Sequence, residues 1–150
     1  MQNVKCKMQN EKCGIRTERH QDRQPSAARV PRDLSDRLLA FAVRVGKVVN
    51  ALPATRLGRH VAAQLIRSGT SAAPNYEEGC AAESRADFIH KLSICLKELR
   101  ESRYWIRLIV ESESLPAKKM AGLQDECMQL CKIFAQSLLT ARKNQRKRKQ

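Results

Sequence analysis

Four apolar stripes with helical spacing are the feature that most constrains the fold. In residues 34–52 apolar positions recur at alternating intervals of four and three, and comparable stripes recur in residues 57–66, 88–109 and 120–138. This spacing puts the apolar side chains on one face of a helix, which must be buried against another element. No segment shows the alternation of a half-buried strand. The sequence therefore predicts an all-α protein, an antiparallel up-and-down four-helix bundle over residues 33–141.

Local signals set the limits of the first two helices. The first helix is expected over Asp33–Ala51, with the aspartate as its cap, and Pro53 ends it because proline cannot continue the hydrogen-bond ladder. Thr55 is the expected N-cap of the second helix. Pro74 disfavours a helical residue before it, and we expect a kinked continuation of this helix to about Cys80.

The third and fourth helices have equally clear starts. Ser84 is expected to cap the third helix, and Asp87 occupies the position from which a capping-box side chain reaches back. This helix is expected to end near Glu113 after about 30 residues, or roughly 45 Å. Pro116 is typical of the first helical position and opens the fourth helix. The last turn is expected to give way to a basic C-terminal tail over residues 142–150.

The chain is strongly basic. It holds 29 Lys and Arg against 15 Asp and Glu, a net charge of +14, and the last ten residues hold six basic side chains and no acidic one. Such a charge favours an anionic partner, usually nucleic acid, although a basic tail can also serve solubility alone. The candidate nucleic-acid-binding residues are Arg59, Arg67, Lys91, Lys97, Arg100, Arg103, Arg107, Arg142, Lys143, Arg146, Lys147, Arg148 and Lys149.

Residues 1–32 lack apolar periodicity and are predicted to be a disordered N-terminal arm. They hold a short repeat, MQNVKCK then MQNEKCG, with Cys6, Cys13 and His20 seven residues apart. Three candidate ligands in a flexible arm make a weak metal site, and a low-complexity segment is favoured. No apolar run could span a membrane or serve as a secretory signal, so we expect a cytoplasmic protein with reduced cysteines and no membrane partner.

Chemistry-bearing constellations are few. Cys127 and Cys131 share one helix face but supply only two ligands, so core thiols are favoured over a metal site. Asp87-x-x-His90 only approximates the Glu-x-x-His pair that a di-metal bundle needs twice. No nucleophile with its base and no glycine-rich phosphate loop is visible. The sequence predicts no enzyme, no catalytic residue, no cofactor and no small-molecule substrate.

Two segments, QLIRSGTSAAPNYEEG (64–79) and ESRADFIHKLSICLKELRESRYWIRLI (83–109), resemble a four-helix-bundle family over residues 34–140. This family includes the 23S rRNA-intervening sequence proteins and the accessory variability proteins of diversity-generating retroelements. The resemblance implies a homopentamer with a basic surface and no enzymatic activity. For the retroelement members it implies binding of structured RNA and of a reverse transcriptase. We expect a nucleic-acid-associated adaptor, with a protein-interaction scaffold as the alternative.

The resemblance also assigns structural positions in this chain. The small residues 69–73 are expected to let a neighbouring helix come close, and the glutamates after them to form a polar corner whose role is structural. Trp105 is expected to be a bundle or subunit contact rather than a base-stacking platform. Where the family commonly has alanine, this chain has Cys95 and Leu99. The structural-motif positions are Asn75, Glu78, Gly79, Ser84, Asp87, Phe88 and Trp105, with Lys91 and Arg107 among the matched residues.

Overall fold

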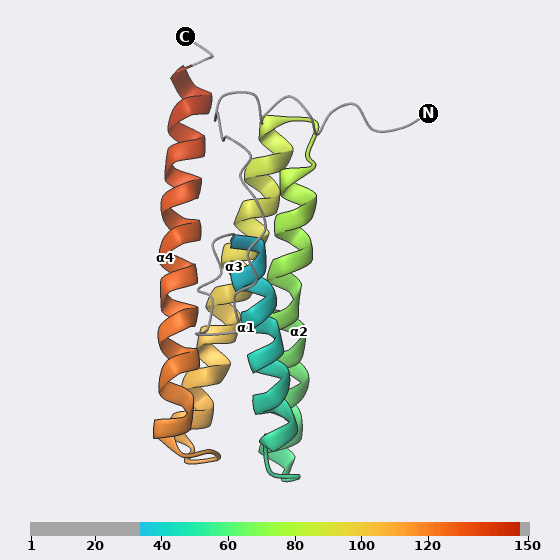
Figure 1. The fold of residues 1–150 in the computed structure, drawn as a ribbon, viewed down its shortest axis with the longest axis vertical. Coiled ribbons are helices and arrows are strands. Elements are labelled where there is room, and N and C mark those ends of the chain that lie inside the picture. The colour runs from blue at the N-terminus through green and yellow to red at the C-terminus, as the bar shows by residue number, and fades with distance from the viewer. Residues whose placement is uncertain (1–33, 148–150) are drawn as a thin grey trace, which may run out of the picture. The chain divides into compact units, whose positions relative to one another are not determined.

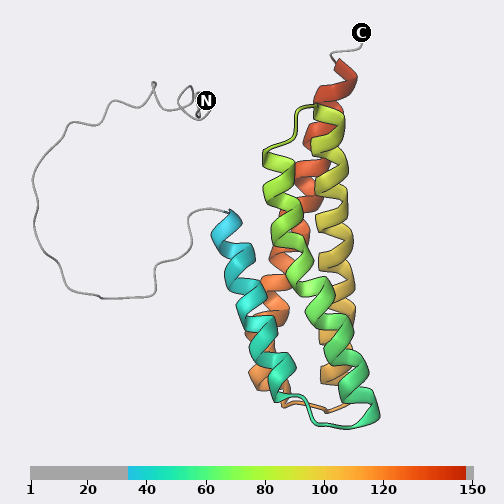
Figure 2. The ribbon, with the colours of Figure 1, turned by 90° about the vertical axis from the view of Figure 1, so that its right-hand side faces the viewer.

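The computed structural model describes residues 34–147, with side chains described to residue 145. Its four helices are α1 (Leu34–Ala51), α2 (Arg56–Cys80), α3 (Arg85–Glu111) and α4 (Ala117–Lys147), and the described part holds no strand. Consecutive helices run in opposite directions (Figures 1 and 2), which confirms the predicted up-and-down bundle. The predicted N-terminal arm, the Asp33 cap and residues 148–150 lie outside the described residues.

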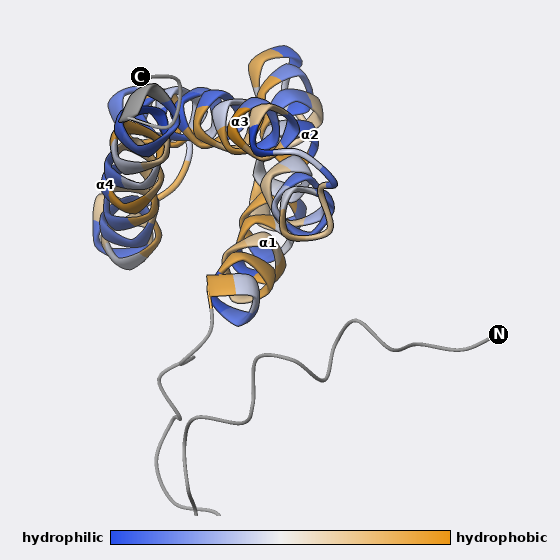
Figure 3. Cartoon of the chain, turned by 90° about the horizontal axis from the view of Figure 1, so that it is seen from above, coloured by the Kyte–Doolittle hydropathy of each residue, from blue (hydrophilic) through white to orange (hydrophobic). Residues whose placement is uncertain are grey.

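Seen from above, the helices follow one another in the order α4, α3, α2, α1 around a horseshoe (Figure 3). Long interfaces join α2 to α3, α3 to α4 and α1 to α2, while α1 and α4 meet over a shorter stretch. A polar contact closes this shorter seam: Arg37 pairs with Glu126 at 3.0 Å and also donates to Gln129. An ion pair therefore bridges α1 and α4 at the short interface, whereas the other three pairs of helices pack along long interfaces.

One apolar core runs through the bundle. Tyr76 of α2 sets its ring edge-on against Phe134 of α4, with centroids 5.7 Å apart, so the rings meet across the interior. A fully buried Phe, Leu, Ile, Met or Val side chain stabilises the fold by about 1.5–3 kcal/mol relative to the same side chain exposed to water. The largest buried side chains belong to all four predicted stripes: Phe41, Phe134, Leu38, Leu65, Leu92, Leu99, Ile106, Ile109, Met120, Leu123, Leu130 and Val45.

Small residues of α2 allow the neighbouring helices to pack closely, as predicted. Gly69 is buried against α1, whereas Ser68 and Ala72 are buried and contact Ser102 and Cys95 of α3. A Cβ atom added to Gly69 would lie 2.8 Å from Cγ1 of Val45 and 2.9 Å from its Cγ2. Valine is short and stiff at χ1, so it cannot swing aside. Only glycine fits at position 69 with α1 in its present place.

The second helix passes through Pro74 and ends at Cys80, as predicted. Proline offers no amide hydrogen to the carbonyl of Thr70, but Thr70 is exposed and water can satisfy that oxygen. Next to it, Nδ2 of Asn75 donates to the carbonyl of Ser71 at 2.9 Å. Asn75 thus adds a hydrogen bond to the helix beside the proline.

Both predicted N-caps are present. The Gly58 amide donates to Oγ1 of Thr55 at 3.0 Å, and the Asp87 amide donates to Oγ of Ser84 at 3.1 Å. The third helix ends two residues earlier than predicted, at Glu111, because Glu113 is left-handed with a φ of 53°. The following amide, Ser114, donates back to the carbonyl of Ile109 at 3.1 Å, which closes the helix end as a Schellman turn does.

The prediction of a basic tail from residue 142 was wrong as far as residue 147. The fourth helix continues to Lys147, so Arg142 and Lys143 are helical residues. Ala141 is 6% exposed and extends the apolar stripe one turn beyond Leu138. The Arg, Lys and Gln residues that follow are good helix formers, so nothing stops the helix at 141.

Candidate nucleic-acid interface

Four cations of α3 lie along one face of that helix. Lys97, Arg100, Arg103 and Arg107 follow one another at spacings of three, three and four, which places them on successive turns of the same side. All four are exposed, and none of them forms an ion pair within the described residues. We call these four residues the basic stripe. Their positive charge faces solvent without an ion-paired carboxylate in the described residues.

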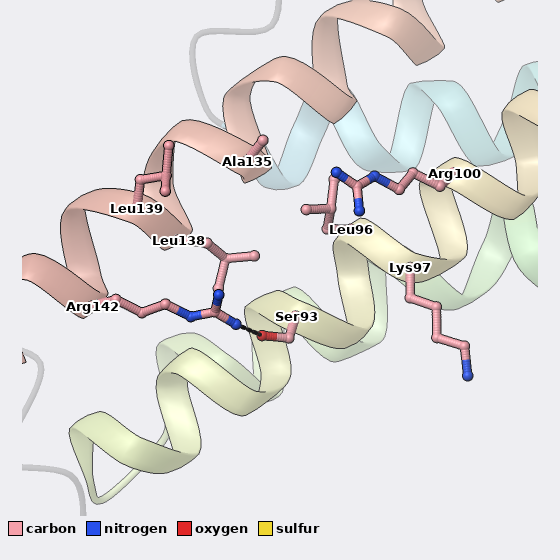
Figure 4. Close-up of a pocket in the computed structure, with 8 residues that line it drawn as sticks. All are labelled: Ser93, Leu96, Lys97, Arg100, Ala135, Leu138, Leu139 and Arg142. Atoms are coloured by element: carbon pink, nitrogen blue, oxygen red, sulfur yellow. Dashed lines mark hydrogen bonds between the residues drawn. The ribbon is translucent and has the colours of Figure 1, made fainter.

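The basic stripe borders a groove of about 450 Å³ between α3 and α4 (Figure 4). Arg142 of α4 reaches across it, and its Nη2 atom donates to Oγ of Ser93 at 3.4 Å. Leu139 stands at the rim and is 63% exposed. A groove with cations at its edge and an apolar floor can hold an anionic partner that also has apolar surface. The lining residues are Ser93, Leu96, Lys97, Arg100, Ala135, Leu138, Leu139 and Arg142.

Two other predicted nucleic-acid-binding cations face the seam between α2 and α3 instead. Arg67 forms an ion pair with Glu101, and its Nη1 atom lies 3.8 Å from a carboxylate oxygen of Glu98. Lys91 pairs with Glu78 at 2.5 Å, and this hydrogen bond is the main cause that raises the pKa of Lys91. These two charges are engaged within the bundle, and the structure does not bring them to the basic stripe.

The remaining candidates lie apart from both regions. Arg59 is exposed and donates to the carbonyl of Ala54 at 2.7 Å, which ties the start of α2 to the preceding connection. Lys143 is exposed on α4. The side chains of Arg146 and Lys147, and all of Arg148 and Lys149, lie outside the described residues. The structure therefore gathers Lys97, Arg100, Arg103, Arg107 and Arg142, and it leaves Arg59, Arg67 and Lys91 elsewhere.

The structural-motif residues sit at the corner between α2 and α3. Gly79 is buried where α3 crosses, and a Cβ there would lie 3.2 Å from Cβ of Lys91. Phe88 is half-buried and packs against the core. The Asp87 carboxylate makes no return hydrogen bond to Ser84 at this described corner, so only half of the predicted capping box is formed. This part of the motif shapes the turn between α2 and α3.

A cluster of aromatic side chains joins α2 and α3 farther along the same seam, away from the corner. Trp105 is half-buried, its Nε1 atom donates to Glu101 at 3.4 Å, and His60 meets it edge-on at 5.5 Å. This agrees with the prediction of a bundle contact. Its neighbour Tyr104 is 59% exposed and meets the Trp105 ring edge-on at 4.9 Å.

Sequence reasoning missed a buried hydroxyl pair in the seam. Ser102 of α3 donates to Ser68 of α2 with 3.0 Å between the two oxygens, and both residues are 0% exposed. The only signal was their place within otherwise apolar stripes. It also missed the groove, because the groove depends on the register of α3 against α4.

The cysteines of the described helices are mostly core residues, as predicted. The thiols of Cys95 and Cys127 donate to the carbonyls of Ala72 and Leu99 at 3.3 and 3.4 Å. Burial raises the pKa of Cys95 to about 12. The pKa of Cys131 is instead lowered to about 7, chiefly by its hydrogen bond with Cys127 and then by the charges of Arg103 and Arg100. The field of the basic stripe thus reaches a buried thiol.

The described helices hold neither a cluster of metal ligands nor a membrane-spanning segment. Within residues 34–147, no group of three or more His, Cys, Asp or Glu side chains is arranged to hold a metal ion, and Asp87 and His90 belong to no such group. None of the described helices is long and apolar enough to cross a membrane.

Fold and surface together define a class of protein, the up-and-down four-helix bundle with a basic outer face. The model of the family described as 23S rRNA-intervening sequence protein matches residues 34–136, and the chain belongs to that family. Its fold is similar to a crystal structure of a protein with unknown function from the S23 ribosomal protein family of Bacteroides thetaiotaomicron VPI-5482. The identity is 31%, the match covers 69% of this chain and 96% of that chain, and the TM-score is 0.63. Among curated proteins, none matches this sequence.

Proposed function

We propose that this protein is a non-enzymatic, cytoplasmic adaptor that binds structured RNA through the basic stripe and the neighbouring Arg142. The observation that carries the proposal is the separation of charge on α3. At the seam between the two helices, Lys91 of α3 and Arg67 of α2 have carboxylate partners, whereas Lys97, Arg100, Arg103 and Arg107 have no ion-pair partner in the described part of the chain. The family name, which refers to an intervening sequence of 23S rRNA, adds support.

Unpaired surface cations bind a polyanion by releasing the counterions condensed on it. In about 0.1 M salt, a slope of roughly 0.9 in log K per neutralised phosphate corresponds to about an eightfold gain for each contact. Two arginines that each neutralise a phosphate would therefore account for a factor of about sixty. Because phosphates carry no sequence information, this binding selects shape and charge density rather than particular bases.

The test compares two variants of equal charge. Arg100→Glu with Arg107→Glu reverses two residues of the basic stripe, and Lys118→Glu with Lys119→Glu reverses two exposed residues at the start of α4. Each double variant lowers the net charge from +14 to +10, because each reversal removes two charges. Fluorescence anisotropy with a structured RNA in salt from about 50 to about 200 mM measures both affinity and its salt dependence.

We expect the first variant to bind roughly 50-fold or more weakly at the lowest salt, and the second to lose only a few-fold through the general field. Equal losses would assign binding to net charge rather than to the basic stripe. No binding by the unaltered protein at low salt, or binding indifferent to salt, would contradict the proposal.

The proposal includes assembly as a homopentamer, in which several copies pool their positive potential. Two apolar side chains one turn apart on the outside of α1, Leu39 and Val43, are 60% and 52% exposed and supply apolar surface that a neighbouring copy could cover. Light scattering at micromolar concentration tests this, with Leu39→Lys and Val43→Lys expected to lower the measured mass. A monomer before any substitution would contradict the pentamer.

A protein-interaction scaffold is the second candidate function, and the apolar floor of the groove favours it. Leu139 is 63% exposed beside the buried Leu138 and Leu96, an arrangement that RNA phosphates do not need. A reverse transcriptase is one partner of this kind. Leu139→Gln should leave RNA affinity unchanged if RNA binds only the cations. If the unaltered protein binds no RNA in low salt, the scaffold becomes the better proposal.

A further inference from the structure

Tyr104 is the most exposed aromatic ring of the described bundle. All six aromatic residues of the chain lie in the described part, and five of them, Trp105 included, are buried in the core or packed partly against it. Trp105 is half-buried, whereas Tyr104 is 59% exposed. Leaving such a ring in water forgoes the stabilisation that burial would give. Tyr104 therefore presents an aromatic face to solvent that a ligand can reach.

The Tyr104 ring is held in place from one side. Its contact with Trp105 is edge-on, with centroids 4.9 Å apart and planes at 79°. Trp105 is fixed in turn by His60 at 5.5 Å and by its hydrogen bond to Glu101 at 3.4 Å. A ring that is already ordered loses little conformational entropy when a ligand stacks on it. The support thus makes Tyr104 a preorganised surface.

The basic stripe brackets this ring. Arg100 lies four residues before Tyr104 and Arg107 three residues after it, which is about 6 and 4.5 Å along the helix axis on the same face. Glu101, the one carboxylate three or four residues from Tyr104, is engaged by Arg67 and Trp105. Anionic groups that approach Arg100 therefore come close to the Tyr104 ring without repulsion from a free carboxylate beside it, while Glu111 stands one turn beyond Arg107.

From this arrangement we infer that Tyr104 is a stacking platform for an unpaired nucleotide base, with Arg100 and Arg107 binding the flanking phosphates. The inference rests on the proposed RNA binding and narrows it to RNA with single-stranded nucleotides beside a helix. An aromatic face between cations is the combination that single-strand binding proteins use, because every base has a face that can stack. A paired base inside a duplex cannot reach the ring.

The experiment uses two RNA duplexes with the same number of phosphates, one blunt and one with a short unpaired adenosine overhang. Tyr104→Ala should weaken binding of the overhang RNA roughly tenfold, which corresponds to one stacked base, and change the blunt duplex by less than about twofold. Tyr104→Phe keeps the aromatic face and should bind both RNAs as the unaltered protein does.

Trp105 supplies a second readout, because it is the single tryptophan of the chain and lies 4.9 Å from Tyr104. Its emission should change when the overhang RNA binds and stay constant with the blunt duplex. In Tyr104→Ala this difference should disappear. Thermal melting of both variants checks that the bundle is intact.

The outcomes separate the two proposals. If the unaltered protein binds neither RNA, the proposed function fails and this inference fails with it. If it binds both and Tyr104→Ala weakens both equally or neither, RNA binding stands and stacking is refuted. Loss of binding in Tyr104→Phe as well would assign Tyr104 to a hydroxyl contact instead of a ring contact.

Discussion

Charged residues have different roles on the two sides of α3. On the side that meets α2, Glu98 and Glu101 are met by Arg67, and Lys91 is met by Glu78. Hydroxyl groups and small residues fill the space between these pairs. On the outer side, Arg100 and Arg107 stand about one and three turns from Lys97, with no ion pair in the described residues.

This difference shows that the placement of the acids, rather than the number of bases, decides which cations can act on a partner. An arginine with a carboxylate across a seam adds to the cohesion of the bundle and loses its external field. An arginine on the far side keeps its field and adds little to stability. Net charge summed over the chain contains both kinds and cannot tell them apart.

The largest expected effect tests how far the bundle depends on close packing between α1 and α2, on the other side of α2 from α3. Gly69→Ala puts a methyl group within 2.8 Å of Val45, and we expect it to destabilise the protein by about 1–2 kcal/mol, since overpacking outweighs the gain in helix propensity. The control is Gly46→Ala in α1, where nothing lies within 4 Å of the added Cβ, and it should stabilise by up to about 1 kcal/mol. Urea unfolding of both measures the midpoint. Equal behaviour of the two variants would show that α1 can move away from α2.

A slightly smaller effect is expected from the buried hydroxyl pair. Ser102→Ala removes the donor to Ser68 and should lower the free energy of unfolding by about 1 kcal/mol. Ser93→Ala is the matched control, because this serine is half-buried on the groove side and hydrogen-bonds within its own helix to Ile89 at 2.8 Å. It should cost less than about 0.5 kcal/mol.

A double-mutant cycle with Ser68→Ala shows whether the two serines act as a pair. If they do, the double variant should lose less than the sum of the single losses. Additive losses would mean that each hydroxyl stabilises the bundle through its own helix carbonyl and that the seam owes nothing to the pair.

Much of the fold could be predicted because its signals are local. The apolar stripes, the caps at Thr55 and Ser84 and the passage through Pro74 each depend on residues within a few positions of one another. The end of α4 was missed for a related reason: ARKNQRK is polar all round by composition, and only the burial of Ala141 shows that the helix still packs there. A single small apolar residue gives little periodicity to detect.

The candidate site could be predicted only in outline. Arg67 and Arg107 look equivalent in sequence, since each lies on a helix among other charged residues. The partner of Arg67 is 34 residues away on the next helix, so its pairing depends on how α2 and α3 are rotated against each other. Spacing rules within one helix do not contain that rotation. Consequently the sequence identified the basic residues but could not separate paired from unpaired ones.

Neutralising one arginine on each side tests that separation directly. Arg67→Gln should lower stability by only about 0.5 kcal/mol, because Arg67 is 55% exposed and solvent screens its ion pairs, and it should leave the salt slope of RNA binding unchanged. Arg107→Gln should leave stability unchanged and reduce that slope by about one. Chemical denaturation and anisotropy titrations on the same two proteins measure both quantities. A reduced slope in Arg67→Gln would erase the distinction between the two sides of α3.

The smallest expected effect uses Cys131 as a buried reporter of the outer charges. The pKa of Cys131 is lowered, first by its hydrogen bond with Cys127 and then by the charges of Arg103 and Arg100, and each of these causes favours the thiolate. Removing a nearby positive charge disfavours the thiolate, and Arg103→Gln should therefore raise the pKa of Cys131 toward its ordinary value near 9.0. Carbon-13 NMR of labelled cysteine follows the titration, with Cys131→Ser to assign the signal.

Cys95 is the internal control for this titration, because burial raises its pKa to about 12. It should remain a thiol throughout pH 6–9, since even pH 9 lies about three units below that pKa. Bound RNA should act like the substitution, because phosphates on the basic stripe cancel the field that favours the thiolate. If neither Arg103→Gln nor saturating RNA changes the measured pKa of Cys131, then Cys127 alone sets that pKa. The outer charges would then act on solvent only, and the two sides of α3 would be electrostatically independent.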